Sequence, residues 1–169
     1  ILEPGAAYYV CCPAGPGASV FQASLDAVGW RLRPTWVWVK TVLVLGHSDY
    51  HYQHEPILYG YTNGPGRRGR GGVGWFGDNS QTSVFQIDRP AASRDHPIMK
   101  PVALVDTHLQ NSSRPGMVVY DPFLGSGTTV VSAHALRRVC YGMEIDPRYA
   151  QVAIERWQQV TGEQAHKVA

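Results

Sequence analysis

The sequence has few cysteines, no long apolar run and almost no net charge. Its three cysteines, Cys11, Cys12 and Cys140, are odd in number and two are adjacent, which excludes a disulfide framework and favours a reducing compartment such as the cytoplasm. No apolar stretch approaches the roughly 20 residues of a membrane span, and no secretory signal peptide is visible. The formal charge is only +2, so electrostatic binding of any partner must depend on local clusters.

The length and composition predict one globular domain. The chain has 169 residues, of which 44% are hydrophobic and 17% charged, enough to bury a core. It opens at Ile1 rather than Met, and its first residues already resemble the middle of a fold. We therefore expect a single, N-terminally truncated domain over residues 1–169.

The first 61 residues predict strands around one helix. Apolar runs predict strands over 6–12 and 55–61, and a longer strand over 32–45 that is interrupted near Lys40. Helical spacing over 19–28 ends at Gly29, a plausible C-terminal glycine of a helix. Trp36 and Trp38 are interpreted as core residues rather than a stacking platform.

A glycine-rich stretch with three arginines follows. Residues 62–77 include seven glycines together with Arg67, Arg68 and Arg70. Such a composition buries too little apolar surface to order itself well, so we expect a loop or inserted region that runs to about Arg94. The arginines suit contacts with DNA phosphates, but a solvated loop explains them equally well.

The second half alternates clearly between helix and strand. The pattern predicts helices over 101–109, 126–136 and 147–160, and strands over 117–120 and 139–145. Strand, glycine-rich turn, helix, strand and helix form the βαβ unit of a parallel sheet. The predicted fold class is therefore α/β.

The turn in that unit carries a candidate ligand site. Residues 121–129 leave a strand and open a helix, where glycine lets the backbone approach a ligand and the first amides lack partners. The pair Gly125 and Gly127 alone is weak evidence, since a structural turn uses glycine too. Glu144, near the end of the next strand, suits the ribose hydroxyls of a ligand, whereas Asp146 suits either the site or a cap on the helix that starts at Pro147.

Three motifs together resemble a known family. The run Asp121-Pro122-Phe123-Leu124-Gly125-Ser126-Gly127-Thr128-Thr129, the later Glu144-Ile145-Asp146-Pro147-Arg148-Tyr149 and the earlier His96-Pro97-Ile98-Met99-Lys100-Pro101 resemble the S-adenosylmethionine-dependent DNA adenine-N6/cytosine-N4 methyltransferases. The resemblance is strongest to the circularly permuted (beta-type) group, in which the cofactor-binding half follows the catalytic half. It implies a Rossmann-like methyltransferase fold, with a mostly parallel sheet and helices on both faces.

The resemblance also implies regions and residue roles. Residues 62–94 would be the target-recognition loop region and residues 96–160 the cofactor-binding half. The residues that would bind S-adenosyl-L-methionine are His96, Lys100, Pro101, Asp121, Pro122, Phe123, Gly125, Ser126, Gly127, Thr128, Thr129 and Glu144. In this reading a methyl group passes to the exocyclic amino group of adenine or cytosine in double-stranded DNA, with the target base flipped out. A homodimer is compatible with it, and a membrane partner is not expected. The choice of base, the recognition sequence and an accompanying nuclease stay open.

One expected motif is missing. The family's catalytic tetrapeptide, Asp or Asn followed by Pro-Pro and an aromatic residue, occurs nowhere, since Asp121-Pro122 and Asp146-Pro147 are the only Asp-Pro pairs. No catalytic residue is therefore predicted, and we expect the chain by itself to be inactive. Truncation explains the absence, and a degenerate copy that only binds DNA or cofactor is the alternative.

Two other site types receive little support. His47, His51 and His54 do not form a four-ligand pattern with recognised spacing, so no metal site is predicted. A nicotinamide-dependent dehydrogenase would also use a glycine turn followed by an acid, but the third glycine of its fingerprint falls at Val130.

Overall fold

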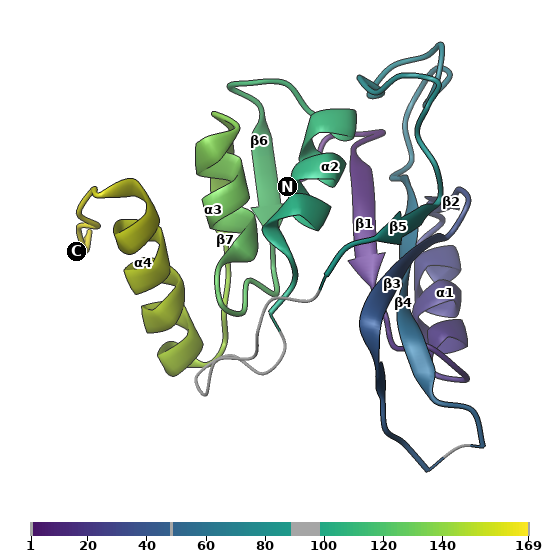
Figure 1. The fold of residues 1–169 in the computed structure, drawn as a ribbon. Helices are drawn as coiled ribbons and strands as arrows, with labels where there is room; N and C mark the ends of the chain where they lie inside the picture. Colours follow the sequence, from purple (N-terminus) through teal and green to yellow (C-terminus); the bar gives the residue numbers. More distant parts are fainter. Residues whose placement is uncertain (1, 48, 89–98, 169) are drawn as a thin grey trace. The chain divides into compact units, whose positions relative to one another are not determined.

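The computed structural model describes residues 2–47, 49–88 and 99–168. The chain divides into two compact units, Ile1–Asp88 and Arg89–Ala169 (Figure 1). Among the described residues, no helix is both long enough and apolar enough to cross a membrane. His96, one of the predicted site residues, lies outside the described part of the chain.

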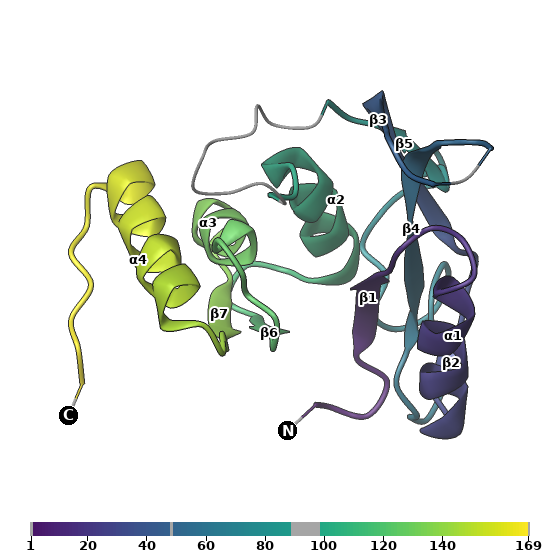
Figure 2. The same cartoon turned by 90° about the horizontal axis from the view of Figure 1, so that it is seen from below.

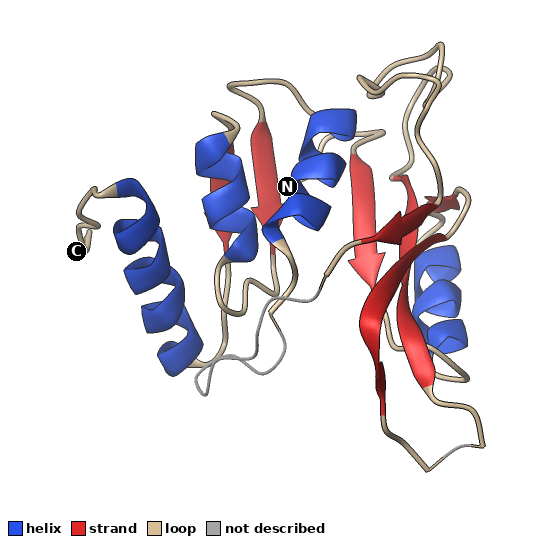
Figure 3. Ribbon diagram, viewed as in Figure 1, coloured by secondary structure: helices blue, strands red, loops and turns tan. Residues whose placement is uncertain are grey.

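The first unit is a five-stranded sheet with one helix. Its elements are β1 (Ala7–Cys11), α1 (Ala18–Ala27), β2 (Arg31–Leu32), β3 (Trp36–Val44), β4 (Tyr52–Tyr61) and β5 (Val84–Gln86) (Figure 3). The strand order is β1-β4-β3-β5, and β2 pairs with β4. β4 runs antiparallel to β1, β2 and β3, which differs from the mostly parallel sheet that we expected. The reason is the short connection 45–51 between β3 and β4, because a parallel crossover needs a dozen residues or more.

The predicted loop region contains a strand that the sequence did not reveal. β5 pairs in parallel with β3, Val37 lying opposite Val84 and Trp38 opposite Phe85. The Trp38 indole N–H donates to the carbonyl of Ile87 at 2.7 Å, just past the strand. A strand of three residues is too short to show a periodic pattern, so the sequence did not predict β5 within the loop or inserted region expected over 62–94.

The glycine- and arginine-rich stretch is held against the start of β1. The Gly5 amide donates to the carbonyl of Asn63 at 2.9 Å, and the Thr62 hydroxyl donates to the carbonyl of Glu3 at 3.1 Å. Arg68 donates through Nη2 to the carbonyl of Pro4 at 3.2 Å. This stretch therefore lies at the amino end of β1, tied there by backbone hydrogen bonds and one arginine.

The two faces of this sheet are packed differently. On one face, Leu25 of α1 forms a buried cluster with Tyr8, Cys12 and Leu58. The opposite face is aromatic, and on it Trp36 and Trp38 are 4% and 1% exposed, which confirms them as core residues. Lys40, two residues further along the same face, is also buried, and its ammonium group is 2.5 Å from the Glu55 carboxylate.

The second unit contains the predicted βαβ arrangement. Its elements are α2 (Val102–Ser112), β6 (Val118–Asp121), α3 (Thr128–Ala135), β7 (Val139–Gly142) and α4 (Pro147–Thr161) (Figures 1 and 2). β6 and β7 are parallel, Val118 lying opposite Val139 and Asp121 opposite Gly142. α3 connects them and packs against β7, α2 and α4. The predicted strand over 139–145 was too long, because pairing ends at Gly142 where β6 ends.

α4 begins and ends with local signals that the sequence carries. Asp146 accepts at Oδ1 from the Arg148 amide at 2.9 Å, and Pro147 occupies the first turn. Gly162 ends the helix with φ of 75°, a left-handed conformation that favours glycine. Asp146 is therefore a helix cap, one of the two roles considered for it.

The buried ion pair of the first unit gives a stability prediction. Glu55→Gln leaves the Lys40 ammonium buried without its carboxylate, and we expect the free energy of unfolding to fall by about 3 kcal/mol. Urea denaturation measures the change. The double variant Lys40→Met/Glu55→Leu is the control and should regain most of the loss, because a buried apolar pair tolerates low dielectric. A single variant as stable as the parent would contradict this account.

Candidate functional site

The candidate site lies where β6 and β7 end side by side. Ligands of open α/β sheets bind outside the carboxyl ends of the strands. Beyond the last strand pair, two backbone hydrogen bonds still join the loops that leave these ends: the Met143 amide donates to the carbonyl of Asp121 and the Leu124 amide to the carbonyl of Met143, both at 2.9 Å. These hydrogen bonds hold the backbone at the strand ends without the help of a ligand.

Glu144 connects the two loops. Its Oε2 accepts from the Gly125 amide at 2.7 Å, and its Oε1 accepts from the Asp146 amide at 3.0 Å. These hydrogen bonds, the one from Asp146 first and then the one from Gly125, lower the pKa of Glu144 below its ordinary value. A carboxylate offers about four acceptor positions, so Glu144 stays ionised and keeps acceptor capacity for the hydroxyls of a ligand.

The two glycines of the loop have different tasks. Gly127 has φ of 78°, and a Cβ there would come within 2.8 Å of the Ala153 Cβ, so glycine lets α3 begin against α4. Gly125 has φ of 55°, but among the described residues a Cβ there would meet only the Phe123 carbonyl, at 4.0 Å. The space beside Gly125 is therefore open, as the approach of a ligand to the backbone requires.

Three of the predicted polar residues shape the loop from within. Asp121 accepts from the Phe123 amide at 3.0 Å and from the Thr129 hydroxyl at 2.6 Å. The Thr128 hydroxyl donates to the carbonyl of Lys100 at 3.3 Å, which ties the start of α3 to the chain two residues before α2. Asp121, Thr128 and Thr129 thus act first on the conformation of the loop.

Arg156 belongs to the site although sequence reasoning missed it. From α4 its Nη1 donates to the Thr128 hydroxyl at 3.0 Å, to the carbonyl of Ser126 at 3.2 Å and to the Ser126 hydroxyl at 3.5 Å. Burial lowers the pKa of this guanidinium. The available signal was spacing, because Arg156 follows the buried Ala153 by three residues and so shares its helix face.

Several large apolar side chains at the ends of β6 and β7 are exposed. Phe123 is 88% exposed and Ile145 99% exposed, and Tyr141 and Met143 are also largely exposed. Large apolar residues that gather at the strand ends of an α/β unit suit a surface that an apolar ring covers.

The other predicted residues are scattered. Lys100 is half-buried and Pro101 buried directly before α2, while Pro122 is exposed in the loop. Arg67, Arg68 and Arg70 belong to the first unit. No group of three or more His, Cys, Asp or Glu side chains that could hold a metal ion occurs in the described parts of the chain. Burial, followed by the nearby Asp121 carboxylate, raises the pKa of the Cys140 thiol to about 11, so this thiol is no ready nucleophile.

Comparison with known proteins gives matches along most of the chain. A family model described as DNA methylase matches residues 1–155. Among curated proteins, the type II methyltransferase M.SmaI of Serratia marcescens is 38% identical over 77 residues, which are 46% of this chain and 26% of that protein. The orphan methyltransferase M.BamHII of Bacillus amyloliquefaciens is 41% identical over 61 residues, 36% and 23% of the two chains. The matches thus span about a quarter of these relatives.

Solved structures with the same fold cover nearly the whole chain. The complex of M1.HpyAVI with SAM superposes with a TM-score of 0.73 at 22% identity, over 92% of this chain and 76% of that one. TTHA0409 of Thermus thermophilus, complexed with S-adenosyl-L-methionine, gives a TM-score of 0.73 at 23% identity, over 96% and 73%. The predicted α/β, Rossmann-like fold is confirmed.

The pKa of Glu144 leads to a pH prediction. A carboxyl group whose pKa is lower in the folded chain stabilises the fold fully above its ordinary value of 4.5, and this contribution is lost as pH falls through the lowered pKa. We therefore expect the stability difference between the parent and Glu144→Gln to be constant above about pH 6 and to shrink below pH 4.5. Urea midpoints across this range measure it. A difference that grows on acidification would contradict the assigned hydrogen bonds.

The contacts of Arg156 lead to a second prediction. Arg156→Met keeps the apolar stem but removes the donor to Ser126 and Thr128, and we expect a loss of about 1–2 kcal/mol. Amide hydrogen exchange over residues 125–130 should quicken. Glu155→Gln changes an exposed neighbour on the same helix and should leave this exchange unaltered. Equal exchange in Arg156→Met and the parent would show that the loop does not depend on Arg156.

Proposed function

The chain belongs to the DNA methylases, which it matches over residues 1–155, and from this premise we propose that it forms the S-adenosylmethionine-binding part of an enzyme that methylates the exocyclic amino group of adenine or cytosine in DNA. The expected family is thereby confirmed, whereas the circular order of its halves stays a prediction. The observation that carries the proposal is the Glu144 carboxylate, which is held by the Gly125 and Asp146 amides beside the open glycine loop.

The described residues fit such a cofactor. Glu144 offers acceptors to the two ribose hydroxyls, the surface of Phe123 and Ile145 suits the adenine ring, and the open side of Gly125 lets the ligand approach the backbone. Lys100, and His96 outside the described residues, are proposed to hold the methionine end. Asp121, Ser126, Gly127, Thr128 and Thr129 keep the loop in shape for it.

The bound cofactor supplies an electrophilic methyl group. Methyl transfer is an in-line displacement, in which the amino nitrogen forms a bond to the methyl carbon, the bond to sulfur breaks and the amine loses a proton. An enzyme helps chiefly by positioning the two partners. The residues of this chain position the methyl donor, whereas the tetrapeptide that would hold the amine does not occur in the sequence.

The proposed substrate is double-stranded DNA with its target base flipped out, since stacking shields the amino group from in-line attack. Arg67 and Arg70 are exposed and available to phosphates, while Arg68 is engaged with Pro4. No disulfide joins the cysteines in the described part of the chain, which suits a reducing compartment such as the cytoplasm. The family match decides against a dehydrogenase, and no observation favours an inactive remnant.

Calorimetric titration of the 169-residue chain tests the proposal. We expect saturable binding of S-adenosylmethionine and none of a nicotinamide dinucleotide. Glu144→Ala should weaken this binding at least about tenfold, because it removes hydrogen bonds to a charged acceptor. Glu155→Ala, which removes an exposed carboxylate from α4, is the matched control and should bind like the parent.

The same preparation separates binding from turnover. Mixed with double-stranded DNA and radiolabelled cofactor, it should transfer no methyl group above background, because nothing in it holds the target amine. Preferential binding of the dinucleotide would overturn the proposed function, and efficient methylation would show that the chain holds the amine by residues other than the missing tetrapeptide.

A further inference from the structure

All five arginines of the first unit lie on two segments that contact each other. Two of them, which the sequence did not single out, are in β2 or directly after it, and three are in the glycine-rich stretch: Arg31, Arg33, Arg67, Arg68 and Arg70. Four are exposed, and Arg68 is half-buried. Among the described residues, none of the five forms an ion pair with a carboxylate. Such a local concentration of one charge on a chain of small net charge indicates an anionic partner.

Tyr61 brings the two segments together. β2 pairs with the end of β4, where Arg31 lies opposite Tyr61. The guanidinium carbon of Arg33 lies 5.9 Å from the centre of the Tyr61 ring, and Arg33 donates through Nη2 to the carbonyl of Arg68 at 3.5 Å. From the glycine-rich stretch, Gly69 lies so near that a Cβ on it would be 3.8 Å from the Tyr61 hydroxyl. The arginines of β2 and those of the glycine-rich stretch therefore lie around one buried tyrosine.

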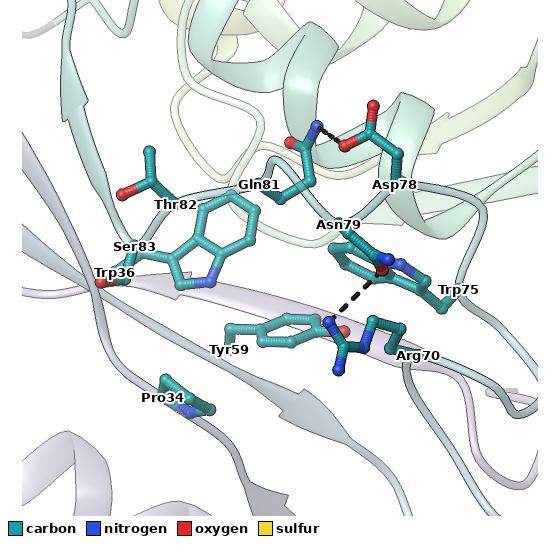
Figure 4. A pocket seen from close by; sticks show the side chains of 10 residues that line it. All are labelled: Pro34, Trp36, Tyr59, Arg70, Trp75, Asp78, Asn79, Gln81, Thr82 and Ser83. Carbon is teal, nitrogen blue, oxygen red and sulfur yellow. Dashed lines mark hydrogen bonds between the residues drawn. The ribbon is translucent and has the colours of Figure 1, made fainter.

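Hydrogen bonds hold the glycine-rich stretch in a tight turn. The Val73 amide donates to the carbonyl of Arg67 at 2.9 Å, which closes the turn. Within it, Arg70 donates through Nη1 to the Asn79 side-chain oxygen at 3.3 Å, as Figure 4 shows. A guanidinium has five N–H donors, so Arg70 keeps most of its donors for a ligand. Because the turn is already ordered, a ligand loses less free energy in ordering it.

Arg68 differs from its neighbours. Its guanidinium donates to the carbonyl of Pro4 at 3.2 Å and lies against Gly5, where a Cβ would overlap it. Arg68 thus ties the turn to the start of β1. The other four arginines are exposed, and we call them the four-arginine surface: Arg31, Arg33, Arg67 and Arg70.

The chemistry of the four-arginine surface suits the phosphates of a nucleic acid duplex. Guanidinium groups donate to phosphate oxygens in pairs. Proteins that bind single strands add exposed aromatic rings on which the bases stack. Residues 28–35 and 60–75 expose no aromatic ring, since Trp30 and Trp75 are half-buried and Tyr61 is buried. The surface therefore favours a duplex, whose bases are already stacked on one another.

We propose that the four-arginine surface binds the phosphates of duplex DNA irrespective of sequence, and that Arg31 and Arg33 contribute to it as Arg67 and Arg70 do. The choice of DNA over another polyanion rests on the proposed function. Contacts with phosphates fix the position of a duplex but carry no sequence information. The surface thereby supplies affinity for any duplex, and the choice of target sequence depends on other residues.

Fluorescence anisotropy of a labelled duplex, titrated with the 169-residue chain at several salt concentrations, tests this inference. Neutralising four phosphates predicts a slope of about −3.6 for the logarithm of the affinity against that of the salt concentration, or a loss of roughly 100-fold between about 50 and 200 mM salt. Arg31→Gln and Arg33→Gln should each make the slope shallower by about 0.9. Arg33→Lys keeps the charge and should keep the slope.

Arg137→Gln is the matched control, since Arg137 is an exposed arginine of the second unit. It should leave the slope unchanged, and a slope as shallow as that of Arg31→Gln would indicate diffuse attraction and overturn the surface. Parental slopes in both Arg31→Gln and Arg33→Gln would overturn the part assigned to β2. A single strand of the same length that binds as tightly as the duplex would overturn the choice of a duplex. Equal displacement of the duplex by polyglutamate would overturn the preference for phosphate.

Cofactor binding and duplex binding are separate measurements on the same preparation. Duplex binding with the predicted slope, but without binding of S-adenosylmethionine in the calorimeter, would count against the proposed function alone. Cofactor binding without salt-dependent binding of the duplex would overturn the four-arginine surface alone.

Discussion

The hydrogen bond from the Gly125 amide to Glu144 joins two loops that leave neighbouring parallel strands. Because the same carboxylate also accepts from the Asp146 amide, its position is fixed from the glycine loop and from the start of α4. Two further hydrogen bonds hold the glycine loop: Asp121 accepts from the Thr129 hydroxyl, and Arg156 donates to the Thr128 hydroxyl. The Glu144 carboxylate thus links the glycine loop to the start of α4.

The features that the sequence predicts well are those that several local signals support together. The βαβ unit of the second half has a glycine turn, helical spacing and an Asp-Pro cap that all agree, and the structure confirms it. The predicted strand extended three residues beyond the end of β7, because Met143 and Ile145 continue its apolar pattern. Both side chains are exposed and lie past Gly142, the last residue that pairs with β6. Exposed apolar residues beyond the end of a strand thus imitate the apolar pattern of a buried strand. β5 and Arg156 were missed since both act through contacts that are distant in sequence.

The direction of β4 determines at which end of the sheet each loop of the first unit lies. Since β4 is antiparallel to β1 and β3, the connection 45–51 lies at their carboxyl ends and the glycine- and arginine-rich stretch lies at their amino ends. Composition alone made the arginines candidates for contacts with DNA phosphates, with a solvated loop as the equal alternative. Topology places them on the edge opposite to the one at which α/β sheets hold their substrates. A local cluster of charge therefore indicates affinity for phosphate but does not indicate where along the sheet the chemistry takes place.

Methyl transfer requires both the methyl donor and the accepting amine to be positioned. Holding two reactants in an attack geometry is worth up to about 7–11 kcal/mol, but only when both are held. Under the proposed function, the hydrogen bonds around Glu144, Gly125 and Arg156 would preorganise the methyl donor, and no group in the sequence matches the tetrapeptide that orients the amine. Since the gain depends on the relative geometry of the pair, orienting the donor by itself recovers almost none of it. If the proposed function holds, the described site binds the methyl donor, and it would contribute to the rate only when the amine is presented along the line of the bond that breaks.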